Sequence, residues 1–262
     1  MARIGDMNNR HERILNILAN EAAASVTGLS DILGVSKETI RKDLQVLAEQ
    51  GKVTRIHGGA ALLDSSVNMP FTIRQNVAEM EKRHVAECAC QLIQENASLI
   101  IEGSTTSLAL CEALLRAPEK LATLSLITNS IKIAQMLGLG AKCRKLFLLG
   151  GRTDAEEGVS RGKFVLSMLR EFHADMAFIS AAAMNQQMQI MAFREDDMLF
   201  QRQAIASASR TYVLMNASKF PSSALYSVCR CQEIDGLVTD AVLDEKNRMD
   251  LLEAHTVYMQ AT

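Results

Sequence analysis

The segment Val35-Ser-Lys-Glu-Thr-Ile-Arg-Lys-Asp-Leu44 has the pattern of a helix that is apolar on one side and charged on the other. Ile40, Leu44 and Leu47 are spaced i, i+4 and i+7, so they lie on one face and point to a core. Ser36 stands in the N-cap position before Lys37, and Gly51 follows Gln50 at a position where a helix commonly ends. The sequence therefore predicts an amphipathic helix over residues 37–50.

The residues on either side of this helix complete a small domain. Two shorter apolar patterns predict helices over residues 10–20 and 27–33, with a glycine-containing turn before the third helix. After the third helix, β-like stretches at residues 52–56 and 60–63 are separated by a pair of glycines, which predicts a short hairpin. These elements predict a winged helix-turn-helix over residues 1–63, mostly α with a small β wing.

The outer face of the third helix carries side chains that suit a DNA groove. Arginine reads guanine or binds phosphate, lysine binds phosphate, glutamine reads adenine, and the first turn of a helix can bind phosphates. Asp43 lies on the flank of the apolar stripe and is expected to pair with a basic neighbour. The alternative is an ordinary three-helix unit with a solvated face, and the near balance of charges in this region does not decide between them. The predicted DNA-binding residues are Ser36, Lys37, Glu38, Thr39, Arg41, Lys42 and Gln45 on the helix, and Arg55, His57, Gly58 and Gly59 in the wing.

Composition sets limits on the whole chain. With 262 residues, 48% of them apolar, it is long enough for a small domain and a full α/β domain. The 28 basic and 30 acidic residues give a formal net charge of -2, so contact with nucleic acid depends on local basic groups. The six cysteines form no CxxC pair, which predicts reduced thiols and no metal site, and no motif calls for a cofactor. Without a secretory or membrane-spanning segment, the expected location is the cytoplasm.

A polar stretch separates the first domain from the remainder. Residues 64–76 hold one proline and lack a helical period, so they are interpreted as an interdomain linker. Beyond them, short apolar strands alternate with helical patterns, which predicts an α/β domain over residues 77–262 with a mostly parallel sheet. Its strands are expected near residues 99–101, 124–128, 146–149, 176–180, 212–215, 236–239 and 256–259.

Several loops that follow predicted strands carry groups that suit a phosphorylated polyol. After the strand at residues 99–101, a small-residue loop leads into a helix whose backbone amides, hydroxyls and glycine can surround a phosphate. Serine and threonine also cap helices for stability alone, so this loop by itself leaves both interpretations open. The carboxyl ends of parallel strands meet at one edge, where ligands bind. The predicted effector-binding residues at this edge are Glu102, Gly103, Ser104, Thr105, Thr106, Thr128, Asn129, Gly151, Arg152 and Lys219.

The helix motif quoted first, followed by Arg55-Ile-His-Gly-Gly-Ala60, resembles the signature of the DeoR family of bacterial regulators of sugar operons. Gly103-Ser-Thr-Thr106, Thr128-Asn-Ser130, Gly150-Gly-Arg152 and Ser218-Lys-Phe220 also match, so the resemblance covers nearly the whole chain. It implies a sensor domain similar to the fold of ribose-5-phosphate isomerase and coenzyme A transferases. It also implies that the glycine-serine-threonine loop and the lysine of the last segment hold the phosphate of an effector.

Four places depart from the family's pattern. Where the family often has aspartate two residues before the loop glycine, this chain has Ile101, with Glu102 beside it. Asn216 replaces the aspartate of a D-x-S-K motif, and the segment Ala181-Ala-Ala183 replaces the usual glycine after a strand. Asp197-Met198 stands where a Glu-Ala pair is usual. These departures bear on which effector the pocket takes and on whether it takes one.

The sequence favours a DNA-binding transcriptional regulator, most simply a repressor of a carbohydrate-utilisation operon. It would bind operator DNA as a homo-oligomer, a dimer or a tetramer, and a phosphorylated sugar or sugar alcohol would release it. One alternative is a sugar-phosphate isomerase with an appended DNA-binding module, which requires a carboxylate of raised pKa at the sheet edge. Because residues 181–184 carry no acidic group, no catalytic residue and no enzyme are expected. The other alternative is an interaction protein whose α/β domain mainly oligomerises.

Overall fold

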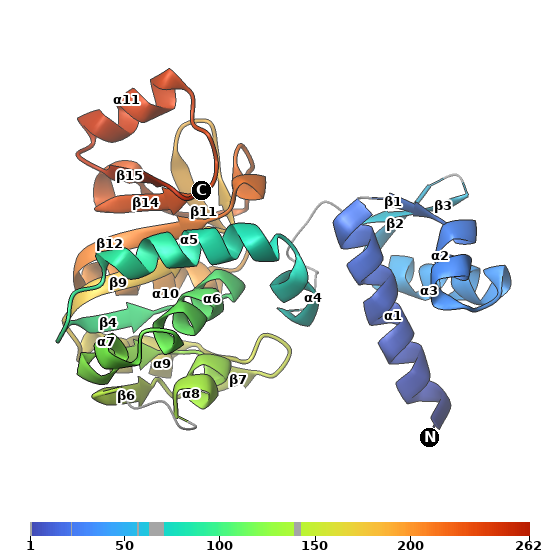
Figure 1. Ribbon diagram of the computed structural model, residues 1–262, viewed down its shortest axis with the longest axis horizontal. Helices are drawn as coiled ribbons and strands as arrows, with labels where there is room; N and C mark the ends of the chain where they lie inside the picture. Colours follow the sequence, from blue (N-terminus) through green and yellow to red (C-terminus); the bar gives the residue numbers. More distant parts are fainter. Residues whose placement is uncertain (1, 22, 57, 63–70, 139–142) are drawn as a thin grey trace. The chain divides into compact units, whose positions relative to one another are not determined.

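The chain folds into two compact units, Met1–Val77 and Ala78–Thr262 (Figure 1). A buried apolar cluster lies within each unit, so each has a core of its own. The computed structural model describes the whole chain except Met1, Ala22, His57, residues 63–70 and residues 139–142.

The first unit is a helix-turn-helix with a three-stranded antiparallel sheet. Its elements are α1 (Ala2–Glu21), β1 (Ala23–Ser25), α2 (Val26–Leu33), α3 (Lys37–Glu49), β2 (Val53–Ile56), β3 (Gly59–Leu62) and α4 (Phe71–Asn76). The strands are ordered β1-β3-β2, and the hairpin of β2 and β3 is the predicted wing. Ile40, Leu44 and Leu47 of α3 are fully buried against α1 and α2, as their spacing predicts.

The ends of the helices follow the capping rules. The hydroxyl of Ser36 accepts a hydrogen bond from the amide of Thr39 at 3.1 Å, which confirms the predicted N-cap of α3. Gly34 and Gly51 have φ of 66° and 68°, the left-handed conformation that glycine adopts most easily after a helix. The first helix begins at Ala2, eight residues before the predicted start, because an existing helix extends at little cost when no proline stops it.

The two glycines of the wing have different reasons to be glycine. Gly58 is exposed with φ of 76°, which is the backbone conformation of a tight hairpin turn. Gly59 is buried, and a Cβ there would lie 2.2 Å from the carbonyl oxygen of Ala24. Gly59 is therefore required for the pairing of β3 with β1, a strand too short to predict from sequence pattern.

The predicted linker is partly helical. Residues 71–76 form α4, and Phe71 is buried with 2% of its surface exposed. This helix contacts α1, so it belongs to the first unit rather than to a free connection. A single aromatic anchor is enough to fix a six-residue helix, and it leaves no periodicity for sequence analysis to detect. Residues 64–70 of the predicted linker lie outside the described residues.

The second unit is built on a parallel sheet of seven strands, and all seven are the strands that the sequence predicts. They are β4 (Ser98–Ile101), β5 (Ser125–Thr128), β6 (Lys145–Leu148), β9 (Ala174–Ser180), β12 (Ala208–Met215), β14 (Gly236–Thr239) and β15 (Val257–Gln260). Their order is β15-β14-β12-β9-β4-β5-β6. The carboxyl ends of β5, β4, β9 and β12 therefore lie side by side at one edge.

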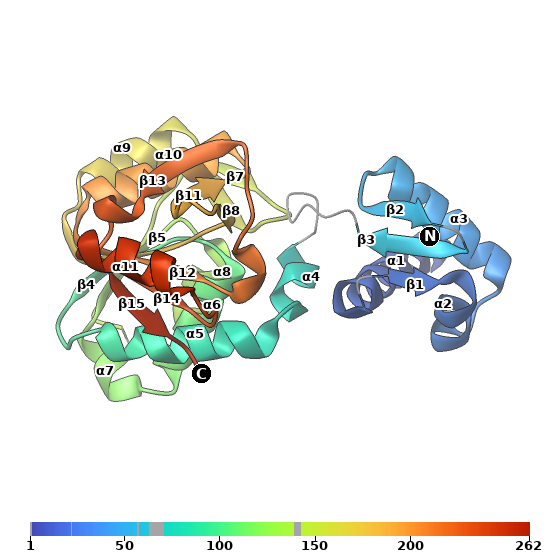
Figure 2. The same ribbon diagram turned by 90° about the horizontal axis from the view of Figure 1, so that it is seen from above.

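Helices cover both faces of this sheet. Figure 2 shows α9 (Lys163–Arg170) and α10 (Glu195–Ala206) on one face, and α5 (Glu79–Leu92) and α7 (Pro118–Thr123) on the other. Beside α5 packs α6 (Thr105–Leu115), which contacts α8 (Ile131–Gly138). The remaining helix, α11 (Glu245–Glu253), packs on β15. Across the described ranges, no helix is both long and apolar enough to span a membrane.

Short antiparallel strands that the sequence does not reveal are added beside α10. They are the hairpin of β7 (Arg152–Asp154) and β8 (Val159–Arg161), and the sheet β10-β11-β13 of Ala183–Met184, Gln189–Ala192 and Tyr226–Arg230. Two short 3₁₀ turns, Ala217–Lys219 and Cys231–Glu233, follow β12 and β13. Helix α10 packs against both β12 of the large sheet and β13 of the small one. Its first turn thereby reaches the edge where the parallel strands end.

Candidate DNA interface and ligand site

The outer face of α3 presents the predicted basic and polar side chains to solvent. Lys37, Glu38, Arg41, Lys42 and Gln45 are all exposed. Arg41 lies 3.4 Å from the carboxylate of Glu38, and Gln45 donates to a glutamate one turn further on at 3.0 Å. These exposed contacts are weak and give way easily to contacts with DNA. The face is therefore available to enter a groove.

The two hydroxyls at the start of α3 are used by the helix itself. Ser36 Oγ accepts from the amide of Thr39, and it lies 2.9 Å from the hydroxyl of the same residue. Their first role is the cap, and each keeps hydrogen-bonding capacity for a phosphate. The cap is therefore observed, and contact of these hydroxyls with DNA stays a prediction.

Arg55 joins the wing to the recognition helix. Its Nη1 donates to the backbone carbonyl of Arg41 at 3.2 Å, although the two residues belong to β2 and α3. This contact brings the exposed side chain of Arg55 onto the backbone of α3 at Arg41, which is exposed as well. Gly58 at the turn is exposed and Gly59 is buried, while His57 lies outside the described residues. Of the two wing glycines, only Gly58 has an open surface toward a partner.

Asp43 has the structural role that its position predicts. It is 3% exposed and accepts from Arg10 Nε at 2.6 Å and Arg10 Nη2 at 3.0 Å. Its other contact is His11 Nε2 at 3.0 Å, and His11 is buried as well. This group ties α3 to α1 and so sets the orientation of the recognition helix.

In the second unit, the loop after β4 is held tightly by its neighbours. The amide of Gly103 donates to Asn129 Oδ1 at 2.8 Å, and Asn129 Nδ2 donates to the carbonyl of Ser160 at 3.2 Å. A Cβ on Gly103 would lie 2.4 Å from Cγ1 of Val159. The glycine is thus required by packing, and Asn129 positions the loop rather than reaching outward with a free amide.

The helix that follows this loop has the features of an anion site. Ser104 Oγ accepts from the amide of Ser107 at 3.0 Å and so caps α6. The amides of Thr105 and Thr106, in the first turn, have no acceptor within the helix and carry the positive end of its dipole. By contrast, Thr128 is fully buried and its hydroxyl accepts from the amide of Ser130 at 3.0 Å, which is a turn contact. The structure therefore brings the first-turn amides to the edge and turns Thr128 inward.

Arginines and aspartates pair across the start of α10. Arg152, which is exposed, donates to Asp196 at 2.8 Å. Arg161 is buried and binds Asp197, and its Nε lies 3.3 Å from Asp154. These pairs fix the β7–β8 hairpin to α10, with Gly151 exposed just before it. Arg152, predicted as an effector ligand, thus already has a carboxylate partner, and the buried Arg161 is a residue that sequence analysis missed.

Glu102 is the most unusual ionisable group at this edge. It is 5% exposed and receives hydrogen bonds from the amide of Ser180 at 2.7 Å, from its hydroxyl at 3.1 Å, and from Gln201 Nε2 at 2.8 Å. Burial, helped by the nearby carboxylate of Asp197, raises the pKa of Glu102 to about 8. This chain has Ile101, a fully buried sheet residue, where the family pattern has a carboxylate, but it carries a carboxyl group one residue later, at Glu102.

The turn after β12 completes the edge. Asn216 is buried and donates to the hydroxyl of Ser218 at 3.1 Å, and the amide of Ala217 donates to Asp240 at 2.6 Å. Lys219 follows in the same turn and is partly buried. Its strand is separated from β4 by β9 alone, so the lysine and the loop after β4 belong to the same edge.

Two family models match the chain over most of its length. The DeoR-like helix-turn-helix domain matches residues 10–66, and the DeoR C terminal sensor domain matches residues 77–241. The chain belongs to the DeoR family. The resemblance seen in the sequence is thereby confirmed, and the first unit is a DNA-binding domain of the helix-turn-helix class.

Curated relatives of this DeoR-family chain are named as repressors. The glycerol-3-phosphate regulon repressor of Escherichia coli K12 is 28% identical over 88% of this chain and 90% of that protein. The HTH-type transcriptional repressor GlcR of Bacillus subtilis 168 is 30% identical over 95% of this chain and 94% of that protein. This chain is accordingly a transcription regulator rather than a member of an enzyme family.

Among solved structures, the DeoR-family chain is similar to ribose 5-phosphate isomerase A of Methanocaldococcus jannaschii. The identity is 19%, the TM-score is 0.39, and the match covers 54% of each chain. A likeness at this level says nothing about activity.

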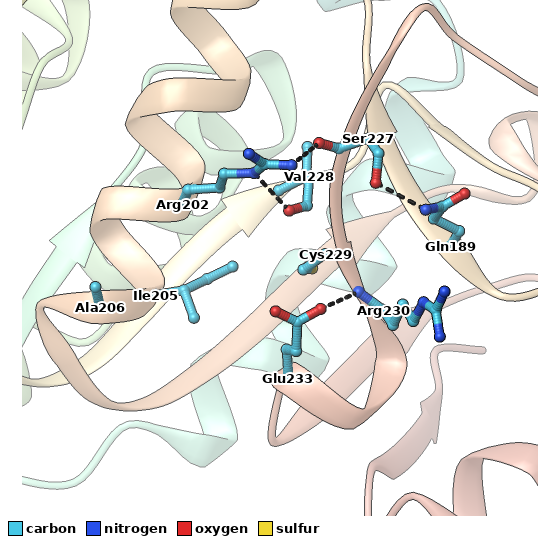
Figure 3. A pocket seen from close by; sticks show the side chains of 9 residues that line it. All are labelled: Gln189, Arg202, Ile205, Ala206, Ser227, Val228, Cys229, Arg230 and Glu233. Carbon is cyan, nitrogen blue, oxygen red and sulfur yellow. Dashed lines mark hydrogen bonds between the residues drawn. The ribbon is translucent and has the colours of Figure 1, made fainter.

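The regulator also has a hollow away from the predicted effector residues (Figure 3). It measures about 610 Å³ and lies between the second half of α10 and β13. Arg202 of α10 donates to the backbone carbonyls of Ser227 at 2.7 Å and Val228 at 3.0 Å, and Glu233 accepts from the amide of Arg230 at 2.7 Å. These contacts attach the small sheet to α10, so the polar groups of this hollow serve the fold first.

Proposed function

We propose that this DeoR-family regulator represses a carbohydrate-utilisation operon and is released by a phosphorylated sugar or sugar alcohol. The observation that carries the proposal is that one chain holds both a helix with an exposed, mostly basic face and a sheet edge where a serine-capped helix begins, which are features that suit DNA and a phosphate. Helix α3 and the wing would bind operator half-sites, with the protein acting as a dimer or tetramer. The effector would occupy the edge formed by the loop after β4, the first turn of α10 and the turn that holds Lys219.

The effector acts if it binds one conformation more tightly than the other. Release requires only a few kcal/mol of such differential affinity. The names of the relatives support the repressing mode, since those proteins are repressors. We test the proposal by thermal unfolding of the full chain with sugar phosphates and their unphosphorylated parents, because a ligand specific to the native state raises the midpoint. A phosphate ester that stabilises the protein should also release it from operator DNA, whereas an equal effect of the parent sugar contradicts the proposal.

Substitution of Arg41 by alanine should weaken operator binding by more than about 1 kcal/mol, the scale of one good base or phosphate contact. Arg41 is exposed on the recognition face, and its partners within the unit are weak. Operator fragments selected from random DNA by the wild-type protein provide the substrate for a mobility-shift titration. Arg13→Ala, an exposed arginine on α1, is the matched control. Equal affinity of the Arg41 and Arg13 variants would show that α3 is not the reading helix.

Substitution of Lys219 by alanine should leave operator affinity unchanged and make release require a higher effector concentration. The lysine lies at the ligand edge and not in the DNA-binding unit. The measurement is the effector concentration that releases half of the bound DNA, with Lys246→Ala on α11, an exposed lysine, as control. A folded Lys219 variant that no longer binds DNA would contradict the separation of the two roles.

One observation favours an enzymatic alternative. Glu102 is the carboxylate of raised pKa at the sheet edge that a sugar-phosphate isomerase needs as a base. Both of its oxygens are occupied by Ser180 and Gln201, however, and residues 181–183 are alanines. An isomerase assay with ribose 5-phosphate separates the two functions, because turnover that is lost in Glu102→Gln would support the enzyme.

A further inference from the structure

The side-chain amide of Gln201 is fixed in one orientation by two acceptors. Its Nε2 donates to Glu102 Oε1 and to the backbone carbonyl of Ser180, both at 2.8 Å. Reversing the amide would point its oxygen at two other oxygens, so the observed orientation is the stable one. Gln201 Oε1 consequently points elsewhere, and it has no hydrogen-bond donor among the described residues although the residue is only 2% exposed. A buried acceptor without a donor is costly, and native proteins keep few of them.

The carboxyl group of Glu102 is a second hydrogen-bond acceptor beside Gln201. Within the described part of the chain, its three hydrogen bonds come from uncharged groups, and no cation there is bonded to this carboxylate. The neighbouring arginine, Arg161, is already bonded to Asp197. The carboxylate of Asp197 acts on Glu102 through its charge, and its side chain is 34% exposed, so the group opens toward solvent on that side.

These three residues, Glu102, Gln201 and Asp197, form an acceptor cluster directly beside the anion-binding loop. Glu102 precedes Gly103 in the chain, and the first turn of α6 begins two residues later. A ligand whose phosphate binds that turn would therefore extend its other end beside the acceptor cluster. We propose that the acceptor cluster selects effectors that offer a hydroxyl or ammonium group there, and rejects those that carry a carboxylate. The inference rests on the proposed function, because it assigns the chemistry of the same ligand.

The selection has a direct physical reason. A hydroxyl or ammonium group can donate to Gln201 Oε1, which otherwise has no donor among the described residues, and sites built this way reject analogues that lack the donor. A carboxylate offers no donor to this oxygen and brings its negative charge close to the carboxylate of Asp197. The phosphate itself contributes equally to both kinds of ligand. The difference between two ligands of equal length therefore reports on the acceptor cluster alone.

The test uses three six-carbon 6-phosphates with the same stereochemistry, together with inorganic phosphate. All three carry hydroxyls, but sorbitol 6-phosphate has a hydroxyl at C1 where 6-phosphogluconate has a carboxylate, and glucosamine 6-phosphate has an ammonium group at C2. Titrations of the full chain followed by thermal unfolding should show that at least one of the first two binds about ten-fold or more tightly than 6-phosphogluconate. In Gln201→Leu this ratio should fall to about three-fold or less, while the effect of inorganic phosphate stays unchanged. Gln203→Leu is the matched control, because Gln203 lies on the same helix and bonds to Arg170 and Ser207 instead.

The other possible results would contradict the inference, and one of them would also contradict the proposed function. Equal or tighter binding of 6-phosphogluconate overturns the inference, and so does an unchanged ratio in folded Gln201→Leu. Stabilisation by inorganic phosphate without discrimination among the esters also overturns it, but leaves the proposed phosphate site standing. If neither phosphate nor any ester stabilises the protein, the proposed function fails and this inference fails with it.

Discussion

Replacing Asp43 by asparagine is expected to lower the free energy of unfolding of the first unit by about 3 kcal/mol. Asp43 is buried and is the common partner of Arg10 and His11. Asparagine keeps the shape but removes the charge, so Arg10, whose side chain is only 20% exposed, loses its carboxylate. Removing one partner of a buried pair costs more than the pair contributes, because the other charge stays buried without compensation.

The two units allow this loss to be localised. The chain has no tryptophan, and its three tyrosines are Tyr212, Tyr226 and Tyr258, all in the second unit. Urea unfolding followed by tyrosine fluorescence therefore reports on the second unit, whereas far-ultraviolet circular dichroism reports on both. In Asp43→Asn the dichroism should show an early transition that the fluorescence does not follow. Asp31→Asn, an exposed aspartate on α2, is the control and should unfold like the wild type.

In the Asp43→Asn variant, operator binding should be lost over the same range of urea concentration as the early dichroism transition. Asp43 connects α3 to α1, so its loss frees the recognition helix before any base contact is changed. A variant that retains wild-type dichroism midpoints would show that the buried pair contributes nothing net, as is known for some buried ion pairs when hydrophobic packing suffices.

The central strands of the large sheet, β4, β5, β9, β12 and β14, were predictable because they are largely buried on both faces, whereas the edge strands β6 and β15 are partly exposed. Strands buried on both faces appear in the sequence as short continuous apolar runs. A run like Leu99-Ile-Ile101, with helical patterns on both sides of it, indicates a buried strand. The β7–β8 hairpin has no such run, since β7 is Arg-Thr-Asp and is mostly exposed. Strand β10 has only two residues, and β13 carries a register shift against β11. Strands that are stabilised by neighbouring elements rather than by an apolar pattern of their own cannot be predicted from the sequence pattern.

The candidate ligand site also has a part that the sequence predicts and a part that it does not. Its loop was predictable as the start of a helix because capping depends on local sequence, as at Ser104, whereas anion binding there stays a prediction. The groups that surround Glu102 were not, because Ser180 and Gln201 stand 78 and 99 residues further along the chain. Only the order of the strands and the packing of α10 bring them together. Thr128 shows the opposite error, since a polar residue at a strand end can serve its own turn.

Replacing Glu102 by glutamine is expected to remove a large part of the pH dependence of the second unit's stability. Folding raises the pKa of Glu102 from 4.5 to about 8, because burial removes the carboxylate from water and the nearby carboxylate of Asp197 acts on it through its charge. The folded protein therefore holds this proton more tightly than the unfolded chain. The contribution of Glu102 to the free energy of unfolding is complete below pH 4.5 and is lost as the pH rises through about 8.

The expected size is roughly 3 kcal/mol between pH 5 and pH 9, somewhat less than the full pKa difference implies, because hydrogen bonds can rearrange around the charge. The quantity to measure is the difference in urea unfolding free energy between Glu102→Gln and the wild type, followed by tyrosine fluorescence at each pH. Glutamine exchanges one acceptor for a donor facing Gln201, so a constant offset between the two proteins is expected. The change of that difference with pH carries the prediction, and it should favour the glutamine variant increasingly toward pH 9.

Glu119→Gln on α7 removes an exposed carboxyl and should give a difference that stays nearly constant with pH. If the Glu102 variant behaves in the same way, the carboxylate is solvated in the folded protein and the acceptor cluster opens more widely than its hydrogen bonds indicate. If the pH dependence is found and ligand saturation abolishes it, the bound effector fixes the protonation state of Glu102. The repressor would then respond to pH and effector through one buried side chain, since proton and ligand binding to the same group are linked.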